Sequence, residues 1–217
     1  MRKYRGIMAI SITTLAVAMS LFQVYTGGYQ ALAAQWQRGI HLGLGLVLIF
    51  LLFPPIKRFS ESKIALGMDL LLAVLSFVIS YYYLSTIEEM LTRQGDPNTM
   101  DLIMSACAIG LVLEATRRTI GWVMSALAIF FLLYGVYGAY FPEIISHAGI
   151  DWPWLSSFLF LSTEGIYGIP IGVSATFVFL FVLFTGAIQL SGGDKVIVDI
   201  SALLLGGTRG GSAKACV

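Results

Sequence analysis

Long apolar stretches separated by short polar turns dominate the chain. A helix needs about 20 mainly apolar residues to cross the hydrocarbon core of a bilayer. Six stretches meet or approach that length, and they are Ile7–Tyr25, Ile40–Phe53, Ile64–Leu84, Leu102–Ala115, Ile120–Phe141 and Ile171–Leu190. The second and fourth are short and are expected to extend into flanking residues. Because lipid offers no partner to an unpaired backbone amide, the pattern predicts an all-α, polytopic membrane protein with about six transmembrane helices.

Two further segments are helical in pattern but are not spans. Asp151 has the position of an N-cap before Trp152 and Pro153, which predicts a short apolar helix from Trp154 to Ser162. This helix is expected to lie at the outer interface or to dip partway into the membrane. After the sixth span, Ser191–Gly207 repeats its apolar residues at helical spacing, which predicts an amphipathic arm helix along the inner interface.

The first apolar segment has a second interpretation. Its basic start, its apolar run and the following "ALAAQ" imitate a secretory signal with a small-residue cleavage site. The apolar run is long for a signal peptide, and further spans follow it. We therefore expect a retained helix.

Composition supports a membrane protein and excludes other classes. The chain is 58% hydrophobic and 12% charged, whereas soluble domains are about 45–50% apolar and about 25% charged. Its net charge of +1 offers no basic face for a nucleic acid. Cys107 and Cys216 lie far apart, so they predict neither a zinc site nor a disulfide framework.

Lysine and arginine orient the spans. Eleven of the 13 basic residues fall on one side of the predicted membrane, and they are Arg2, Lys3, Arg5, Lys57, Arg58, Lys63, Arg117, Arg118, Lys195, Arg209 and Lys214. Only Arg38 and Arg93 fall on the other side. Since basic residues gather in cytoplasmic loops, both termini are predicted to be cytoplasmic in a multi-pass protein of the inner membrane.

Polar and helix-loosening residues mark the mouth of the sixth span. Glu164 is a carboxylate beside the membrane core, where acids tend to be functional, for example in gating. The alternative is an exposed acid stabilised by the dipole of the helix that follows. Gly165, Gly168 and Pro170 allow either an unwound entry or a plain turn into a helix. Ser174 can bond across helices or back to its own backbone, and we favour the second interpretation.

Charged residues also lie at the inner end of the fourth span. Glu114 precedes Arg117 and Arg118 by three and four residues, which places the three side chains on one helix face. We expect a structural ion pair there. Asp69, one turn inside the third span, is also expected to have a structural role.

The sequence does not support catalysis or metal binding. His41 and His147 are isolated from any carboxylate or cysteine at metal-ligand spacing. The stretch "GGTRGGSAK" lacks the Gly-Lys-Ser/Thr ending of a phosphate-binding loop and follows no strand. No nucleophile–base set can be assembled on one side of the membrane, so we expect no enzyme activity and no cofactor.

The second half of the chain resembles a known family. "STEGIYGIPIGVSATFVFLFVLFTGAIQLSGG" followed by "GGTRGGSAKACV", with "RRTIGW" and "LYGVYGAYFPEIISHAG" around the fifth span, resembles the fused permease of tripartite ATP-independent periplasmic (TRAP) transporters. The resemblance is to the type served by TAXI-type substrate-binding proteins, and it covers Arg117–Val217. It implies that residues 1–116 are a small-subunit-like four-helix part and that 117–217 begin the large transport part.

The resemblance implies a function as well. It implies uptake of organic acids driven by a sodium gradient and delivered by a periplasmic TAXI-type binding protein, which Glu164 is placed to contact. Sodium is then the coupling ion, at sites mostly outside this chain. The family's large part continues through re-entrant hairpins, and the chain ends where the first begins, so we expect a truncated or split permease that needs the remainder. The alternative is a non-transporting assembly or accessory subunit.

Overall fold

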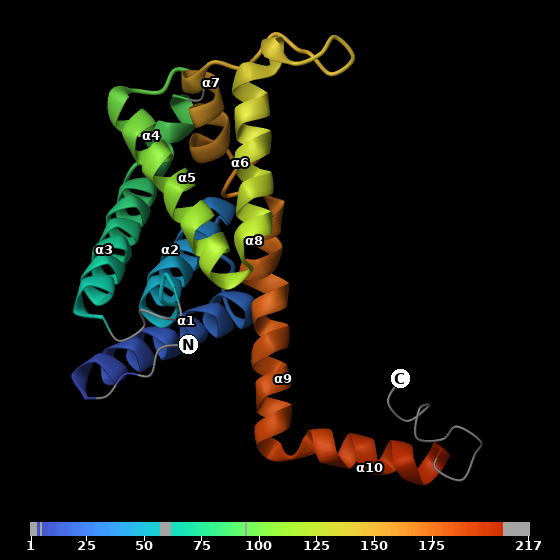
Figure 1. The fold of residues 1–217 in the computed structure, drawn as a ribbon. Coiled ribbons are helices and arrows are strands. Elements are labelled where there is room, and N and C mark those ends of the chain that lie inside the picture. Colours follow the sequence, from blue (N-terminus) through green and yellow to red (C-terminus); the bar gives the residue numbers. More distant parts are fainter. Residues whose placement is uncertain (1–3, 5, 57–61, 94, 206–217) are drawn as a thin grey trace. The chain divides into compact units, whose positions relative to one another are not determined.

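The protein is all-α, as predicted. A computed structural model describes residues 4, 6–56, 62–93 and 95–205, which contain helices and no β-strand. They fall into two compact units, 1–175 and 176–217, which are described separately. The long helices of the first unit are α1 (Ile7–Gly28), α2 (Ala34–Leu52), α3 (Lys63–Ser85), α5 (Thr99–Thr119) and α6 (Trp122–Tyr137), which a 3-10 turn, η2 (Gly138–Tyr140), extends (Figure 1). Its short helices are α4 (Ile87–Thr92), α7 (Trp152–Ser156), the π-helical η3 (Ser157–Leu161) and α8 (Ile169–Val173).

The six predicted spans are confirmed. Among the described residues, six helices are long and apolar enough to cross a membrane, and they are Ile7–Gly28, Ala34–Leu52, Lys63–Ser85, Thr99–Thr119, Trp122–Tyr140 and Ile169–Ser191. The second begins at Ala34 instead of Ile40, and its added residues include Gln37 and Arg38. Both of these polar side chains have hydrogen-bond partners inside the bundle, so their polarity does not end the helix.

The fourth span also extends beyond its apolar run, because its first turn is capped. Asn98 Oδ1 accepts a hydrogen bond from the Asp101 N–H at 2.8 Å, and Asp101 Oδ2 accepts one from the Asn98 N–H at 3.1 Å. This reciprocal pair satisfies two N–H groups that a helix start leaves unpaired. The helix therefore begins at Thr99, three residues before the predicted Leu102.

The core of the first unit lies where α2, α3 and α5 meet. Phe50 and Phe160 are fully buried there. Helices α2 and α3 approach closely, since a Cβ on Gly43 would overlap the Ser80 side chain and one on Gly39 would lie 2.9 Å from Cδ1 of Tyr83. Small residues at such crossings allow membrane helices to pack closely without a hydrophobic driving force between them.

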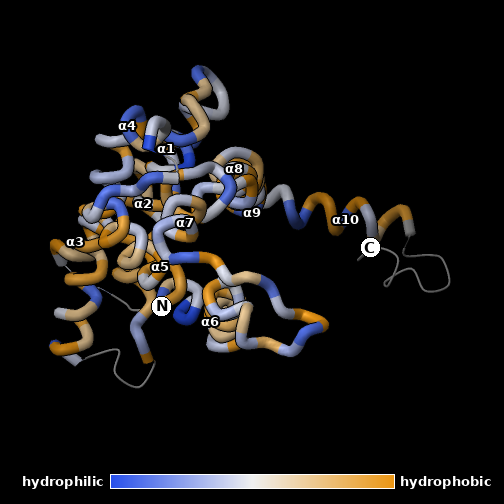
Figure 2. Tube along the Cα trace, turned by 90° about the horizontal axis from the view of Figure 1, so that it is seen from above, coloured by the Kyte–Doolittle hydropathy of each residue, from blue (hydrophilic) through white to orange (hydrophobic). Residues whose placement is uncertain are grey.

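Apolar side chains also cover the outside of the bundle. Phe77 on α3 and Phe131 on α6 are more than half exposed. Figure 2 shows hydrophobic residues in the α3 and α6 segments of the Cα trace. In a soluble protein such a surface would be an aggregation hazard, whereas in a membrane protein it is the surface that faces lipid.

The short segment after α6 packs into the bundle. Asp151 has the N-cap position, but its side chain makes no capping hydrogen bond. The helix begins at Trp152 and continues through η3 to Leu161, close to the predicted Trp154–Ser162. Leu155, Ser156 and Phe160 are buried, so this helix is not confined to the membrane surface. A turn over residues 162–168 leads from it to α8.

The second unit holds the end of the sixth span and the arm helix. A π-helical turn, η4 (Ser174–Val178), leads from the first unit into α9 (Phe179–Ser191), which ends at Gly192 with φ +76°. The predicted amphipathic helix is α10 (Gly193–Leu205), with exposed apolar residues that include Ile197 and Leu203. The end of the chain over residues 206–217, where the first hairpin is expected to begin, lies outside the described residues, as do the basic residues at positions 2, 3, 5, 57 and 58. The division expected between residues 116 and 117 stays a prediction.

Candidate functional site

The entry to the sixth span is a tight turn. The N–H of Ile166 donates to the Leu159 carbonyl at 2.8 Å, and that of Gly168 donates to the Gly165 carbonyl at 3.0 Å. A Cβ on Gly165 would overlap the Leu159 backbone, so the turn needs glycine at that position. Pro170 lies in the first turn of α8, where its missing N–H leaves no bond unmade. The entry to the sixth span is therefore a hydrogen-bonded turn into a helix and not an unwound segment.

Glu164 lies in this turn with its side chain exposed. Its N–H donates to the Ser162 hydroxyl at 3.1 Å, which fixes the backbone of the turn. It precedes α8 and is not one of the residues of that helix's first turn. The carboxylate is thus available to a partner from solvent, and stabilisation by the α8 dipole is weak because that effect is confined to the first turn.

Within the first unit, a chain of hydrogen bonds joins α1 and α2 to Ser174, near the start of the sixth span. Gln37 Nε2 donates to Gln23 Oε1 at 2.8 Å, and Gln23 Nε2 lies 2.8 Å from His41 Nδ1. His41 Nε2 lies 3.2 Å from the Ser174 hydroxyl. Because Gln23 presents a donor to Nδ1, the chain requires a neutral His41 with its proton on Nε2. We call Gln23, Thr26, Gln37, His41 and Ser174 the polar junction.

The polar junction corrects one expectation. Ser174 was expected to bond to its own backbone, but its hydroxyl bonds across to α2. Gln37 Nε2 also contacts the Ala175 carbonyl at 3.2 Å and Thr26 Oγ1 at 3.0 Å. Gln23 and Gln37 are 1% and 6% exposed, and the sequence reading missed both. The sequence pattern that could have revealed them is a glutamine inside or next to an apolar span, because a polar group there must find a hydrogen-bond partner.

Arg38 lies beside the polar junction, at the start of α2. Its Nη1 donates to the Tyr167 carbonyl at 2.8 Å. A Cβ on Gly172 would lie 2.8 Å from Arg38 Nε, so glycine leaves room for the guanidinium against α8. The ring of Tyr167 stacks on Tyr83 of α3 with centroids 3.7 Å apart. Burial, and secondarily the neighbouring Tyr83, raise the pKa of Tyr167 well above its usual value.

At the C-terminal end of α5, four charged residues form a cluster, which we call the charge cluster. Glu114 accepts hydrogen bonds at 2.7 Å from Nε and Nη2 of Arg117 and at 2.7 Å from Nε of Arg118. Arg118 Nη1 lies 2.6 Å from Asp69 Oδ1 on α3 and donates to the Phe53 carbonyl at the end of α2 at 3.0 Å. The cluster therefore ties three spans together. The role of Asp69 as the partner of Arg118 was not foreseen, because sequence spacing relates residues of one helix only.

A second buried acid, Asp101, was also missed. It is 0% exposed and accepts a hydrogen bond from the Tyr82 hydroxyl at 2.7 Å. Arg93 Nε lies 3.5 Å from its carboxylate. Together with the capping bond to Asn98, these contacts join the end of α3 to the start of α5. Asp101 is thus occupied by structural partners.

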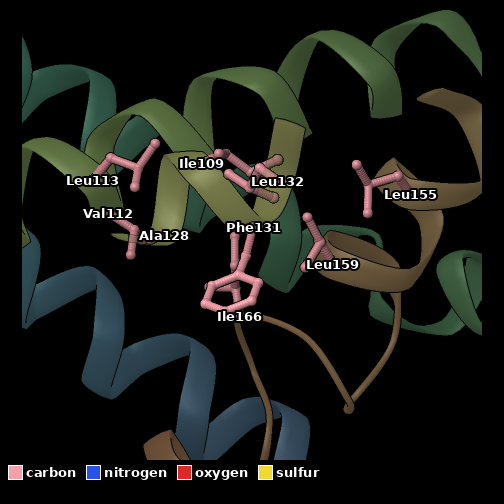
Figure 3. A pocket seen from close by; sticks show the side chains of 9 residues that line it. All are labelled: Ile109, Val112, Leu113, Ala128, Phe131, Leu132, Leu155, Leu159 and Ile166. Carbon is pink, nitrogen blue, oxygen red and sulfur yellow. The ribbon is translucent and has the colours of Figure 1, made fainter. Parts of the chain in front are cut away.

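The first unit also has an apolar pocket of about 300 Å³. Figure 3 shows side chains from α5, α6, the α7–η3 segment and the turn that follows it converging on the pocket, and they are Ile109, Val112, Leu113, Ala128, Phe131, Leu132, Leu155, Leu159 and Ile166. None of them can hydrogen-bond to a carboxylate or coordinate a cation. The pocket is therefore unsuited to an organic acid or to sodium. Among the described residues there is also no group of three His, Cys, Asp or Glu side chains that could hold a metal ion.

Comparison with known proteins decides the family. A family model described as "Tripartite ATP-independent periplasmic transporter, DctM component" matches residues 107–217. The chain belongs to this family. No curated protein and no solved structure matches the chain. The match covers α5 from Cys107 onward, α6, the α7–η3 segment and all of α8–α10.

Membership of this family indicates where the protein lies, what it does and which partners it has. This TRAP permease component is a multi-pass protein of the inner membrane, and its function is transport. The family works with a substrate-binding protein and with other permease subunits, so both are implied as partners. The matched residues include all the candidate site residues predicted from the sequence, which are Glu114, Arg117, Arg118, Glu164, Gly165, Gly168, Pro170 and Ser174.

Proposed function

We propose that this TRAP permease component takes part in the uptake of organic acids, driven by a sodium gradient and delivered by a periplasmic TAXI-type binding protein. The observation that carries the proposal is the match to the DctM component over residues 107–217. The resemblance of residues 162–193 to TAXI-associated permeases supports the type of binding protein. Sodium is the coupling ion, at sites mostly outside this chain.

Within the transporter, we propose that the first unit is a scaffold. Two clusters of buried and part-buried polar residues support this role, because each ties several spans together with side-chain hydrogen bonds. The polar junction joins α1 and α2 to the start of the sixth span. The charge cluster joins α2, α3 and α5. Buried polar groups satisfied in this way hold helices in one arrangement, which suits a part that stays fixed while another part moves.

The proposed orientation places both termini in the cytoplasm, on the strength of the asymmetry of Lys and Arg. Asp96, in the turn before α5, then faces the periplasm, and Lys195, in α10, faces the cytoplasm. In a background with Cys107 and Cys216 replaced by serine, Asp96→Cys should react with an impermeant maleimide in intact cells. Lys195→Cys should react only after the cells are permeabilised. Labelling of both from the same side would contradict the orientation.

Transport itself is tested with the complete transporter that contains this chain, reconstituted in proteoliposomes. Binding protein loaded with a radiolabelled organic acid is added outside. The expected result is uptake that needs both the binding protein and an inward sodium gradient. Potassium in place of sodium serves as the control. Equal uptake with potassium, or with a proton gradient alone, would contradict sodium coupling while leaving the family membership intact.

The contact with the binding protein is tested at Glu164. Glu164→Gln removes an exposed charge from the mouth of the sixth span without touching the bundle. The expected result is a several-fold rise in the concentration of binding protein that gives half-maximal uptake, with the maximal rate unchanged. Asp151→Asn, another exposed acid in the same connection between spans, whose side chain makes no capping hydrogen bond, is the matched control. An equal effect of both variants would mean that the change in uptake comes from surface charge in general, which would contradict a specific contact at Glu164.

A further inference from the structure

The loop that follows α6, residues 141–150, is built rigidly although it lies outside the bundle. The N–H of His147 donates to the Gly138 carbonyl at 3.3 Å, and its Nε2 lies 3.1 Å from the Tyr134 carbonyl. The N–H of Ile150 donates to the Gly135 carbonyl at 2.9 Å. The loop thus pairs carbonyl groups that the end of a helix leaves without partners.

Side-chain packing fixes the same loop. The His147 ring lies edge-on to Tyr134, with centroids 4.8 Å apart, and Phe141 packs on Tyr134 from another side at 4.9 Å. A Cβ on Gly138 would overlap the His147 ring, so glycine is required there for the ring to enter. Gly149 has φ +79°, a backbone conformation that turns the chain back toward α6 and that favours glycine.

This rigid loop presents apolar side chains outward. Ile144 is 97% exposed, Ile145 is 50% exposed, and Tyr140 at the end of the span is 87% exposed. Figure 1 shows the loop leaving the end of α6 sideways and not along the helix axis. The view from above in Figure 2 shows it extending away from the other helices of residues 1–175. Among the described residues of the first unit, none covers the Ile144 side chain.

The depth of the loop relative to the bilayer indicates what covers its exposed apolar side chains. The fifth span ends at Tyr140, so a loop that leaves sideways from this point stays at the level where hydrocarbon meets the headgroups. Trp152 and Trp154, which are partly exposed on α7 at the same end of the bundle, are typical of that level. Apolar residues on a rigid element at this depth are stabilised by insertion into the boundary between headgroups and acyl chains.

We propose that residues 140–145 are a membrane-interface anchor, which inserts Ile144 and Ile145 into the bilayer beside the fifth span. His147 is the positioning residue that holds the loop in the plane of the membrane. The anchor rests on the assignment of the spans and not on transport. It fixes the rotation and depth of α6, from whose end the loop extends.

The test measures the depth of a spin label at Ile144→Cys. The full chain, with Cys107 and Cys216 replaced by serine, is reconstituted in vesicles of phosphatidylcholine and phosphatidylglycerol. Collision with oxygen, which concentrates in lipid, is compared with collision with a water-soluble nickel chelate. Leu133→Cys, exposed on α6, is the lipid reference, and Asp96→Cys, exposed in a polar turn, is the water reference.

The expected result is a label at Ile144 that collides several-fold more often with oxygen than with the nickel chelate, as at Leu133. A label that behaves like the one at Asp96 would overturn the proposal. So would a label protected from both reagents, because it would be covered by protein. Adding His147→Ala to Ile144→Cys should make the label more mobile and move it toward water. An unchanged depth in this second variant would overturn the role of His147.

Discussion

The guanidinium of Arg118 on α5 lies 2.6 Å from the carboxylate of Asp69 on α3, and the two side chains are 1% and 0% exposed. Arg118 also stacks over the ring of Phe50, 5.0 Å from its centroid. Two opposite charges withdrawn from water in this way depend on each other. Removing one partner leaves the other charge buried and uncompensated, which is far more costly than losing a pair at the surface.

Asp69→Asn should therefore destabilise the protein strongly. We expect the free energy of unfolding to fall by about 3 kcal/mol, the low end of the range for a broken buried pair. Unfolding in a titration with sodium dodecyl sulfate, followed by circular dichroism, measures it. Glu89→Gln is the control, because Glu89 pairs with Arg93 at 3.4 Å with its side chain 70% exposed and should cost less than about 1 kcal/mol. Equal losses of unfolding free energy in the two variants would mean that the buried pair contributes no more to stability than the exposed pair.

The polar junction makes a second prediction. Gln37→Leu removes the donor that serves Gln23, Thr26 and the Ala175 carbonyl, so buried acceptors lose their partner. We expect a loss of about 1–3 kcal/mol in the free energy of unfolding. Ser174→Ala removes a single bond between helices and should cost only about 0.6 kcal/mol.

The control for the polar junction is Ser11→Ala. The Ser11 hydroxyl is exposed and bonds back to the Ile7 carbonyl of its own helix, so its loss should leave stability unchanged. The same detergent titration compares the three variants. A Gln37→Leu variant as stable as Ser11→Ala would show that the junction does not hold the start of the sixth span to α2.

A third prediction concerns the turn before the sixth span. Gly165→Ala places a methyl group into the Leu159 backbone and should shift the turn. We expect a lower yield of monodisperse protein in size-exclusion chromatography and a loss of more than about 1 kcal/mol in stability. Gly110→Ala in α5 is the matched control, because a Cβ there meets no atom within 4 Å. That substitution should stabilise the protein by about 0.5–1 kcal/mol, and the two variants should therefore differ in sign.

A fourth prediction follows from the buried phenol of Tyr167. Its raised pKa means that above pH of about 10 the unfolded chain releases this proton while the folded protein keeps it. The free energy of unfolding should then fall with rising pH by up to about 1.4 kcal/mol per pH unit from this group, whereas below pH of about 10 the group contributes no slope. Tyr167→Phe should lessen the loss between pH 9 and pH 11, and the exposed Tyr140→Phe should not. Identical slopes in the two variants would contradict the prediction.

Much of the fold was accessible from the sequence. The six spans appeared within a few residues of their bounds, and the largest error was the start of α2 at Ala34 instead of Ile40. That error has a physical cause. Gln37 and Arg38 look like a polar loop in a hydropathy reading, but they are helical because each has a buried partner in the fold.

The candidate site was less accessible. The ion pair of Glu114 with Arg117 and Arg118 depends on one helix and can be read from spacing, and the structure contains these bonds. The bond between His41 and Ser174 joins residues 133 positions apart, and no local pattern relates them. The expectation that Ser174 bonds to its own helix failed for this reason. The same reason explains why Asp69, Asp101 and Gln23 were not recognised as partners of particular residues.

The sequence by itself determined that the chain is helical and lies in a membrane, because a lipid environment leaves the backbone no choice but to pair within each apolar segment. It also carried the family resemblance that the match over residues 107–217 bears out. Only the tertiary structure decided which polar groups meet, such as Gln37 with Gln23 and Arg118 with Asp69. Side-chain hydrogen bonds act over about 3 Å, so their partners depend on how helices distant in sequence are packed, which periodicity does not encode.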